Sequence, residues 1–210
     1  MKKGKMHAVF HMVLLMAALQ IGRAAVRYVA LLLTGRGESA ELMVSCLLML
    51  LLAGAVMLLS KKQKVSLSVF PQKWGIGYTV ATLIAAGLLV SSILMQGPSF
   101  TAAAGIIYGS VFTPFAEELL FRGYMWNKLR EHFHRDIFVA VLTAILFAIW
   151  HLGYADTVAE KLNGQNLAFV MMMKSIVGLC YGAVLGVVRM KTKNSYSTML
   201  LHGVMNIFGR

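Results

Sequence analysis

The sequence predicts an all-α fold, a polytopic bundle of helices that cross a membrane. Of its 210 residues, 59% are hydrophobic and only 13% are charged, and the mean hydropathy is +0.72. Ordinary soluble domains are about 25% charged, and so few polar residues could not cover the outside of a single core of this length. The excess of apolar side chains is therefore expected to face lipid.

Seven apolar segments have lengths near the roughly 20 residues that a helix needs to cross the hydrocarbon core. Glycine and Gly-Pro pairs break the pattern at 35–37 and 97–98, as strong turn residues do. The basic N-terminus resembles that of a signal peptide, but no convincing cleavage site follows, so we interpret the first segment as a retained span. The predicted spans are residues 8–33, 42–60, 75–96, 100–122, 137–154, 167–189 and 195–209.

Basic residues form short clusters between these segments, which fits a topology signal better than a nucleic-acid surface. With the N-terminus in the cytoplasm, 14 of the 20 Lys and Arg residues lie on the inner side and three on the outer side. We therefore predict a cytoplasmic N-terminus and no nucleic-acid partner. Arg23, Arg27 and Lys174 fall within spans, where we interpret them as reaching the interface or lipid phosphate. The inner residues are Lys2, Lys3, Lys5, Lys61, Lys62, Lys64, Lys73, Arg122, Lys128, Arg130, Arg135, Arg189, Lys191 and Lys193, and the outer ones are Arg36, Lys161 and Arg210.

Three glycines recur at every fourth residue of the sixth segment. Gly178, Gly182 and Gly186 therefore share one face of a helix. Small residues at this spacing let two membrane helices approach closely. We interpret the stripe as a packing seam without chemistry.

Two adjacent carboxylates stand near the end of the fourth segment, in TPFAEELLFRGYMW. A charge at the centre of a membrane helix costs roughly 2.5 to 3.5 kcal/mol on insertion scales, so Glu117 and Glu118 are functional candidates. Neighbouring residues on a helix point about 100° apart, and Glu118 can form an ion pair with Arg122 four residues later. Glu117 is then left without its own cation and can act as a general base. The alternative is structural: both glutamates mark the cytoplasmic end of the span.

The fifth and seventh segments carry further polar residues. His151 follows Phe147 by four residues in FAIWHLGY, and Asn206 follows His202 by four residues in LLHGVMNIFG. Polar side chains of a membrane bundle turn toward its interior. We therefore expect these residues to meet Glu117 in one cavity.

Such a set of side chains is sufficient in kind for hydrolysis of a peptide bond. Glu117 and His151 could activate a water, while His202 and Asn206 could donate hydrogen bonds to the oxyanion. No GxSxG elbow and no HExxH motif is present, which disfavours serine proteolysis and a standard zincin site. We favour a metal-free site; a zinc ion held by Glu117, His151 and His202 is the alternative that the ligand types allow.

Three motifs occur in the order found in a known family. EELLFR resembles an EExxxR motif, FAIWH an FxxxH motif and HGVMN an HxxxN motif. On these motifs the chain resembles the CAAX protease and bacteriocin-processing (CPBP or Abi) family, which includes the type II CAAX prenyl endopeptidases. The resemblance implies an intramembrane peptidase with seven or eight spans, in which a catalytic core at 100–210 follows N-terminal transmembrane helices at 1–99.

The resemblance also implies roles for single residues and leaves the cofactor open between none and zinc. Glu117 becomes the catalytic carboxylate, and His151 is its partner in activating water. His202 and Asn206 become the oxyanion stabilisers. Glu118 and Arg122 match supporting positions of the motif.

The expected substrate is a small membrane-associated peptide or protein, and the expected location is a bacterial cell membrane with the mouth of the active site on the cytoplasmic side. Bacteriocin maturation, signal-peptide processing and self-immunity all fit the resemblance. One alternative is a non-proteolytic membrane scaffold or immunity protein that keeps the motifs as a polar core. Another is a small transporter that relays protons, although no inverted repeat is apparent.

The predicted spans raise one geometric problem. If the fifth helix enters the membrane at Ile137, a rise of about 1.5 Å per residue places His151 deeper than Glu117 by about ten ångströms or more. Either that helix begins in the cytosol or it is strongly tilted.

Overall fold

The computed structural model describes residues 2–162 and 164–209, and within them the chain forms helices and loops without strands. The described helices follow the predicted spans closely, and the predicted all-α fold is confirmed. Met1 and Arg210, which end the two predicted regions, lie outside the described residues. Five of the helices are unbroken: α1 (Lys2–Thr34), α2 (Glu38–Gln63), α3 (Ile76–Met95), α9 (Leu167–Thr192) and α10 (Tyr196–Phe208).

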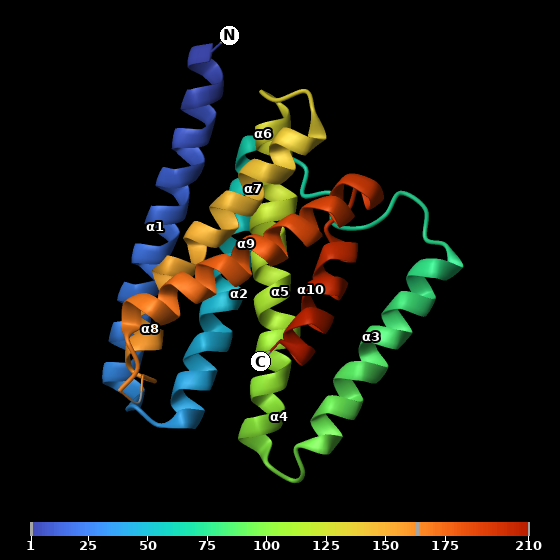
Figure 1. Cartoon of the computed structure of the whole chain (residues 1–210). Helices are drawn as coiled ribbons and strands as arrows, with labels where there is room; N and C mark the ends of the chain where they lie inside the picture. Colours follow the sequence, from blue (N-terminus) through green and yellow to red (C-terminus); the bar gives the residue numbers. More distant parts are fainter. Residues whose placement is uncertain (1, 163, 210) are drawn as a thin grey trace.

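The fourth helical segment is a continuous helix through the middle of the bundle (Figure 1). Two of its parts, η1 and η2, are π-helical, and they flank the two glutamates. Pro114 accounts for the first of them, because proline has no N–H and its ring crowds the carbonyl four residues earlier. Single π turns inside α-helices are frequent at functional sites. The parts are α4 (Phe100–Ile107), η1 (Tyr108–Phe112), α5 (Thr113–Glu118), η2 (Leu119–Met125) and α6 (Trp126–Arg130).

The fifth helical segment packs along α9. It consists of α7 (Asp136–Trp150), the 3₁₀ turn η3 (His151–Tyr154) and α8 (Ala155–Ala159). A Cβ atom on Gly182 would lie only 2.8 Å from the Cα atom of Ala144. The two helix backbones therefore meet at the glycine stripe, and the predicted packing seam is confirmed.

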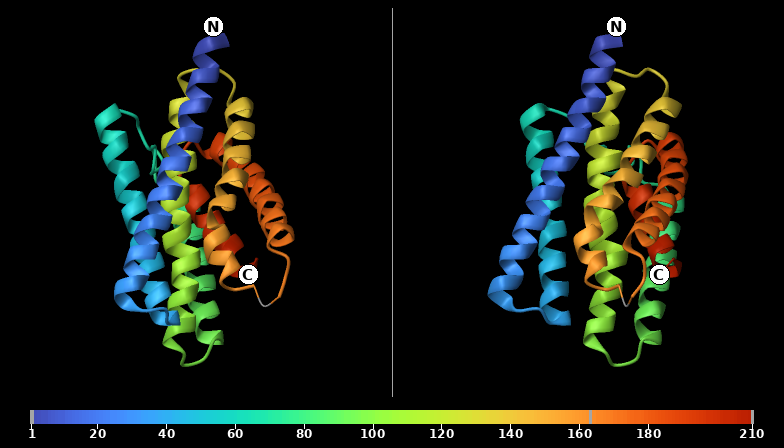
Figure 2. Two further views of the ribbon diagram at one scale, coloured as in Figure 1. Left: turned by 90° about the vertical axis from the view of Figure 1, so that its left-hand side faces the viewer. Right: turned by 60° about the vertical axis from the view of Figure 1, so that its left-hand side comes forward.

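The loops alternate between two ends of the bundle (Figures 1 and 2). The start of α1 and the loops at 64–75, 131–135 and 193–195 lie at one end, which we call the basic end, and the loops at 35–37, 96–99, 160–162 and 164–166 lie at the other. Two of the 14 residues predicted on the inner side are not surface charges, since Arg122 and Arg189 are buried in the bundle. Removing them leaves 14 − 2 = 12 basic residues in that group.

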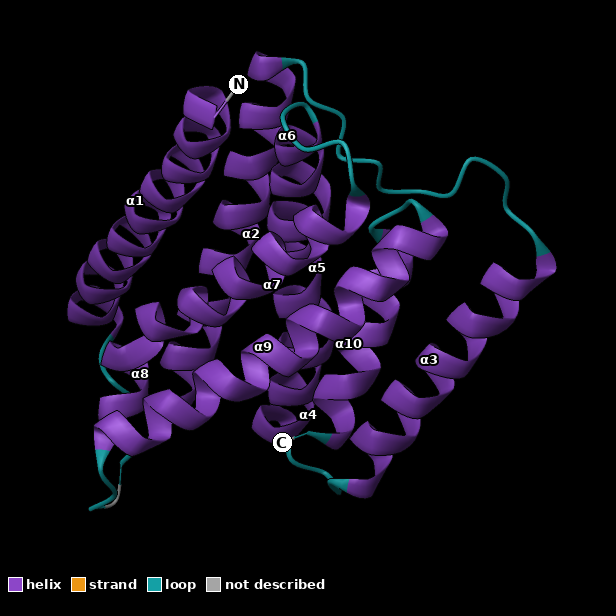
Figure 3. Ribbon diagram, turned by 45° about the horizontal axis from the view of Figure 1, so that its top comes forward, coloured by secondary structure: helices purple, strands orange, loops and turns teal. Residues whose placement is uncertain are grey.

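Within the described residues, five helices are long and apolar enough to cross a membrane: α1, α2, α3, the segment Asp136–Ala159, and α9. Many large apolar side chains on them are exposed, as expected for surfaces that face lipid. Helix α3 stands at the edge of the bundle beside α10 (Figure 3) and has no buried residue. Its polar contacts with the rest of the chain include a 2.7 Å hydrogen bond between the hydroxyls of Thr82 and Tyr196.

The arginines of α1 do not reach toward lipid headgroups as the sequence analysis proposed. Arg23 pairs with Asp156 at 2.9 Å, and the largely buried Arg27 pairs with Glu160. Buried cations need such partners because an isolated charge is costly away from water. The hydrogen bond from Arg27 holds the pKa of Glu160 below its usual range. The first helix is thus tied by charge to the fifth segment.

The predicted difference in depth between His151 and Glu117 arose because the fourth span was predicted to end at residue 122. The central helix continues to Arg130, so Glu117 lies 13 residues, or about 20 Å, from its end. Trp150 lies 14 residues after the start of α7 at Asp136, or about 21 Å along that helix. The two helices therefore extend together beyond the glutamates, and their side chains meet at one level.

Candidate active site

Glu118 is the centre of a buried ionic network. Arg122 donates from Nη1 to Glu118 Oε1 at 2.9 Å, which is the predicted ion pair, and His202 Nδ1 lies 2.9 Å from the same oxygen. Arg122 also donates to the Gly182 carbonyl at 3.1 Å. The side chains of Glu118 and Arg122 are 0% exposed. Through Oε1 this carboxylate holds a cation and a histidine in place, while its Oε2 atom is buried and has no hydrogen-bond partner among the described residues.

Glu117 has neutral partners instead. Its Oε1 atom accepts hydrogen bonds from Trp150 Nε1 and from the Tyr154 hydroxyl, both at 3.0 Å. Its Oε2 atom is buried and has no hydrogen-bond partner among the described residues. One oxygen is therefore fixed by two donors, and the other has a lone pair that no described residue uses.

His151 and His202 lie on either side of Phe147. The Phe147 ring centroid is 4.8 Å from that of His151 and 5.7 Å from that of His202, both edge-on. His151 Nδ1 is 2.8 Å from the Phe147 carbonyl. If that nitrogen carries the proton, the Nε2 atom of His151 is an acceptor. No hydrogen bond joins His151 to Glu117 directly in the described part of the chain, but both contact Tyr154.

Asn206 forms a hydrogen bond that links α10 to the central helix. Its Nδ2 atom donates to the Gly109 carbonyl in η1 at 2.7 Å, and the other N–H of the amide remains for a ligand. Three residues earlier in α10, Gly203 lies so close to Ser110 that a Cβ atom would clash with the Ser110 carbonyl oxygen. Only glycine allows this approach, which brings His202 to Glu118.

The structure thus brings together all six predicted site residues around Phe147 and η1, although in two groups. The first group is Glu118, Arg122 and His202, and the second places Glu117 beside the segment that carries His151. Asn206, which contacts η1, belongs to neither group. Trp150 and Tyr154, the two residues that hold Glu117, were not among the predicted site residues. Their signal was present, because aromatic side chains with a polar tip need a hydrogen-bond partner when buried, and the two are spaced i, i+4.

The zinc alternative requires Glu117, His151 and His202 to converge on one point. Among the described residues, no three His, Cys, Asp or Glu side chains form a group that could hold a metal ion. His202 Nδ1 faces Glu118 rather than Glu117. The donor set as arranged does not fit a three-ligand zinc site.

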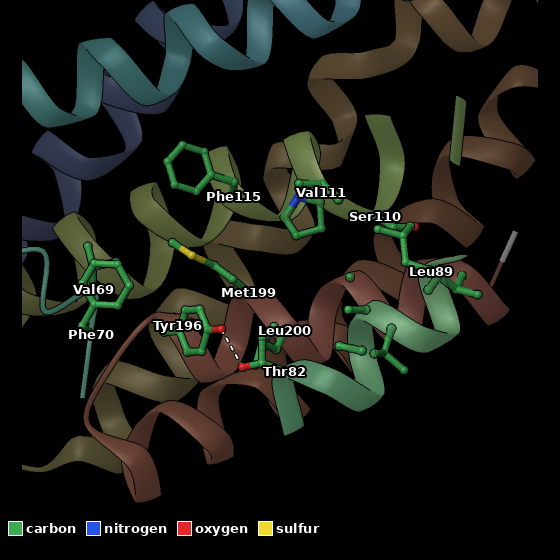
Figure 4. A pocket seen from close by; sticks show the side chains of 16 residues that line it. Val69, Phe70, Thr82, Leu89, Ser110, Val111, Phe115, Tyr196, Met199 and Leu200 are labelled. Atoms are coloured by element: carbon green, nitrogen blue, oxygen red, sulfur yellow. Dashed lines mark hydrogen bonds between the residues drawn. The ribbon is translucent and has the colours of Figure 1, made fainter. Parts of the chain in front are cut away.

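An apolar groove of about 350 Å³ lies beside these residues, between α3, η1, α5 and α10 (Figure 4). Ser110 and Leu89 stand at one end of it, and Val69, Phe70 and Tyr196 at the other. Pro114 and Gly203 in its wall are close in sequence to Glu117 and His202. The Ser110 hydroxyl is buried without a hydrogen-bond partner in the described chain. The remaining lining residues are Thr82, Ala85, Ala86, Val111, Phe115, Met199, Leu200, Val204 and Ile207.

Fold and site together define a helical membrane protein with two adjacent buried carboxylates, one that accepts from neutral donors and one in an ionic network. The family model of the type II CAAX prenyl endopeptidase Rce1-like proteins matches residues 98–208. This match covers 111 of the 210 residues, and the chain belongs to that family. Membership makes the chain an integral membrane protein of a protease family, which acts on a peptide or protein in a membrane. No curated protein and no solved structure matches the chain.

Proposed function

We propose that this chain hydrolyses a peptide bond of a small membrane-associated peptide or protein with Glu117 as the general base. The observation that supports this most is the asymmetry of the Glu117 carboxylate. Trp150 and Tyr154 hold Oε1, and Oε2 has no partner among the described residues. A base needs a fixed position and a lone pair that is not already used in a hydrogen bond, and this arrangement supplies both. Glu118 also has an Oε2 atom without a partner in the described chain, but its Oε1 atom is paired with the cation of Arg122.

In the proposed reaction Glu117 Oε2 takes a proton from a water, whose oxygen attacks the scissile carbonyl carbon. His151 orients that water through Nε2, since its Nδ1 atom is bonded to the Phe147 carbonyl. The proton held by Glu117 then passes to the leaving amine as the C–N bond breaks. The products are a carboxylic acid and an amine, which ionise to a carboxylate and an ammonium group, and Glu117 is regenerated as a carboxylate.

His202 and Asn206 are the proposed donors to the oxyanion of the tetrahedral intermediate. Asn206 has one amide N–H left after its bond to Gly109. His202 can donate from Nε2 only if the ring carries protons on both nitrogens, because Nδ1 faces Glu118. Glu118 then serves as the carboxylate that orients the ring and balances its charge, as partners behind a catalytic histidine do. Arg122 fixes Glu118 in turn.

The apolar groove lined by Gly203 is the proposed binding site for the apolar part of the substrate. We further propose that the N-terminus is cytoplasmic. The 12 basic residues that remain in the predicted inner group without Arg122 and Arg189 support this orientation, because loops rich in Lys and Arg stay on the cytoplasmic side. Processing of a bacteriocin or signal peptide, or self-immunity, are the roles proposed for a bacterial host.

The proposal is tested by comparing the membrane-fraction peptides of cells that produce the wild type, Glu117→Gln or Glu131→Gln. Glu131 is an exposed glutamate at the end of α6 and serves as the matched control. We expect Glu117→Gln to leave at least one peptide uncleaved at unchanged protein abundance, whereas Glu131→Gln resembles the wild type. Identical peptides in all three samples would reject proteolysis and favour a scaffold.

A further inference from the structure

A polar cavity of about 820 Å³ opens at the end of the bundle opposite the basic end. Four of its lining side chains carry charge at neutral pH: Arg27, Glu38, Glu41 and Lys161. A polar space of this size holds many waters, since one water needs only about 10–15 Å³ of probe-occupied volume. The other lining residues are Leu42, Ser45, Thr101, Ala102, Gly105, Tyr108 and Thr157.

The inner wall of this cavity leads to the candidate base. Tyr108 lines the cavity and lies nine residues before Glu117 in the same central helix. Arg27 also lines the cavity, and Arg23 lies four residues before it on the same face of α1. Tyr154 donates a hydrogen bond to Glu117. The guanidinium of Arg23 lies 4.7 Å from the Tyr154 ring centroid and pairs with Asp156. Polar groups therefore continue from the cavity to the carboxylate.

Buried side chains close the route from Glu117 toward the basic end. Every residue of the central helix from 116 to 126 is buried, and so is Leu129. Several of these side chains are large and apolar, including Phe121, Met125 and Trp126. They separate Glu117 from the basic end over most of the remaining length of the helix.

We propose that the polar cavity is the path by which the hydrolytic water reaches Glu117, and that it opens at the end opposite the basic loops. The proposal rests on the proposed function. It places the aqueous opening on the side away from the N-terminus, in contrast to the cytoplasmic mouth expected from sequence. Substrate and water then reach the carboxylate by different routes, through the lateral groove and through this cavity.

Side-specific thiol labelling tests this path without requiring proteolysis. In a Cys46→Ala, Cys180→Ser background, single cysteines replace Ser45, seven residues inside α2, and Tyr108. Ser66→Cys marks the basic end and Ser91→Cys, on exposed α3, marks the lipid-facing surface. The probe is a charged, membrane-impermeant methanethiosulfonate, added to right-side-out and inverted vesicles.

We expect Ser45→Cys and Tyr108→Cys to react from the side opposite to Ser66→Cys, and Ser91→Cys to remain unreactive. Reaction only from the Ser66 side, or no reaction at Ser45, would overturn the path. Because Tyr108→Cys could disturb the site, the Ser45 result decides alone if that variant does not accumulate.

A bulky side chain that fills the cavity provides a second test of the water path. Ala102→Trp should slow labelling of Tyr108→Cys at least tenfold and leave the same membrane peptides uncleaved as Glu117→Gln does. Ile107→Trp on the exposed face of the same helix is the control and should do neither. If Ala102→Trp cleaves peptides as the wild type does, the path is rejected while the proposed function stands. If Glu117→Gln changes no peptide, the proposed function itself fails.

Discussion

Glu117 and Glu118 are adjacent in sequence, but they lie in opposite electrostatic environments. Glu118 contacts a guanidinium and a histidine, whereas Glu117 contacts an indole N–H and a phenol. Each carboxylate has one oxygen without a partner among the described residues, so the two differ in what holds the other oxygen. A cation beside a carboxylate favours its charged form, and neutral donors do so less strongly. The direction in which a carboxylate points from its helix thus determines which partners it meets, although both glutamates lie at nearly the same depth.

The largest expected effect concerns the ionic network. Arg122→Met removes the cation beside Glu118, and loss of one partner of a buried pair costs about 3–5 kcal/mol of stability. Thermal unfolding in detergent should show this loss directly. Lys128→Met breaks a more exposed pair with Glu131 and should cost about 1 kcal/mol or less. Equal shifts for the two variants would show that the network does not stabilise the bundle.

The proposed oxyanion donor gives the next effect. Asn206→Ala should lower the turnover of the peptide that Glu117→Gln leaves uncleaved by roughly 10² to 10³, with little change in apparent affinity. Asn166→Ala at the start of α9 is the control, because Asn166 caps that helix and does not touch the site. A loss of affinity alone would make Asn206 a binding or packing residue.

A smaller effect is expected for the neutral hydrogen-bond donors of Glu117. Tyr154→Phe removes one of the two donors to Glu117 Oε1, and a hydrogen bond to a charged group contributes about 1.5–3 kcal/mol. Turnover should fall about ten- to a hundredfold if that bond positions the base. Tyr28→Phe, at an exposed tyrosine of α1, should turn over like the wild type. A wild-type rate for Tyr154→Phe would mean that Trp150 alone suffices.

Chelation should have no effect. A zinc site would need three protein ligands. His202, which would have to be one of them, forms a hydrogen bond with Glu118 instead of lying beside Glu117. Enzyme dialysed against a strong chelator should keep its activity and contain no stoichiometric zinc by elemental analysis. Loss of activity that added zinc restores would make Glu117, His151 and His202 ligands and end the metal-free proposal.

Much of this arrangement could be predicted from periodicity and spacing. Apolar periodicity placed the helices, and the i, i+4 spacing predicted the pair of Glu118 with Arg122. The fourth span was ended too early because Arg122 was counted as a charge at the membrane edge, whereas its partners allow it to be buried. The contacts of Arg23 and Arg27 with the fifth segment join residues more than 130 positions apart. No local pattern encodes such pairs, nor the meeting of Tyr154 with Glu117.

The difference between the two carboxylates is tested most directly by measuring turnover and thermal stability together for Glu117→Gln and Glu118→Gln. Glutamine at 117 can still accept from Trp150 and Tyr154, so we expect an unchanged unfolding temperature and no detectable turnover. Glutamine at 118 leaves Arg122 buried without its anion, so we expect a lower unfolding temperature and residual turnover. Equal residual turnover in the two variants, or activity retained by Glu117→Gln, would contradict the assignment of Glu117 as the base.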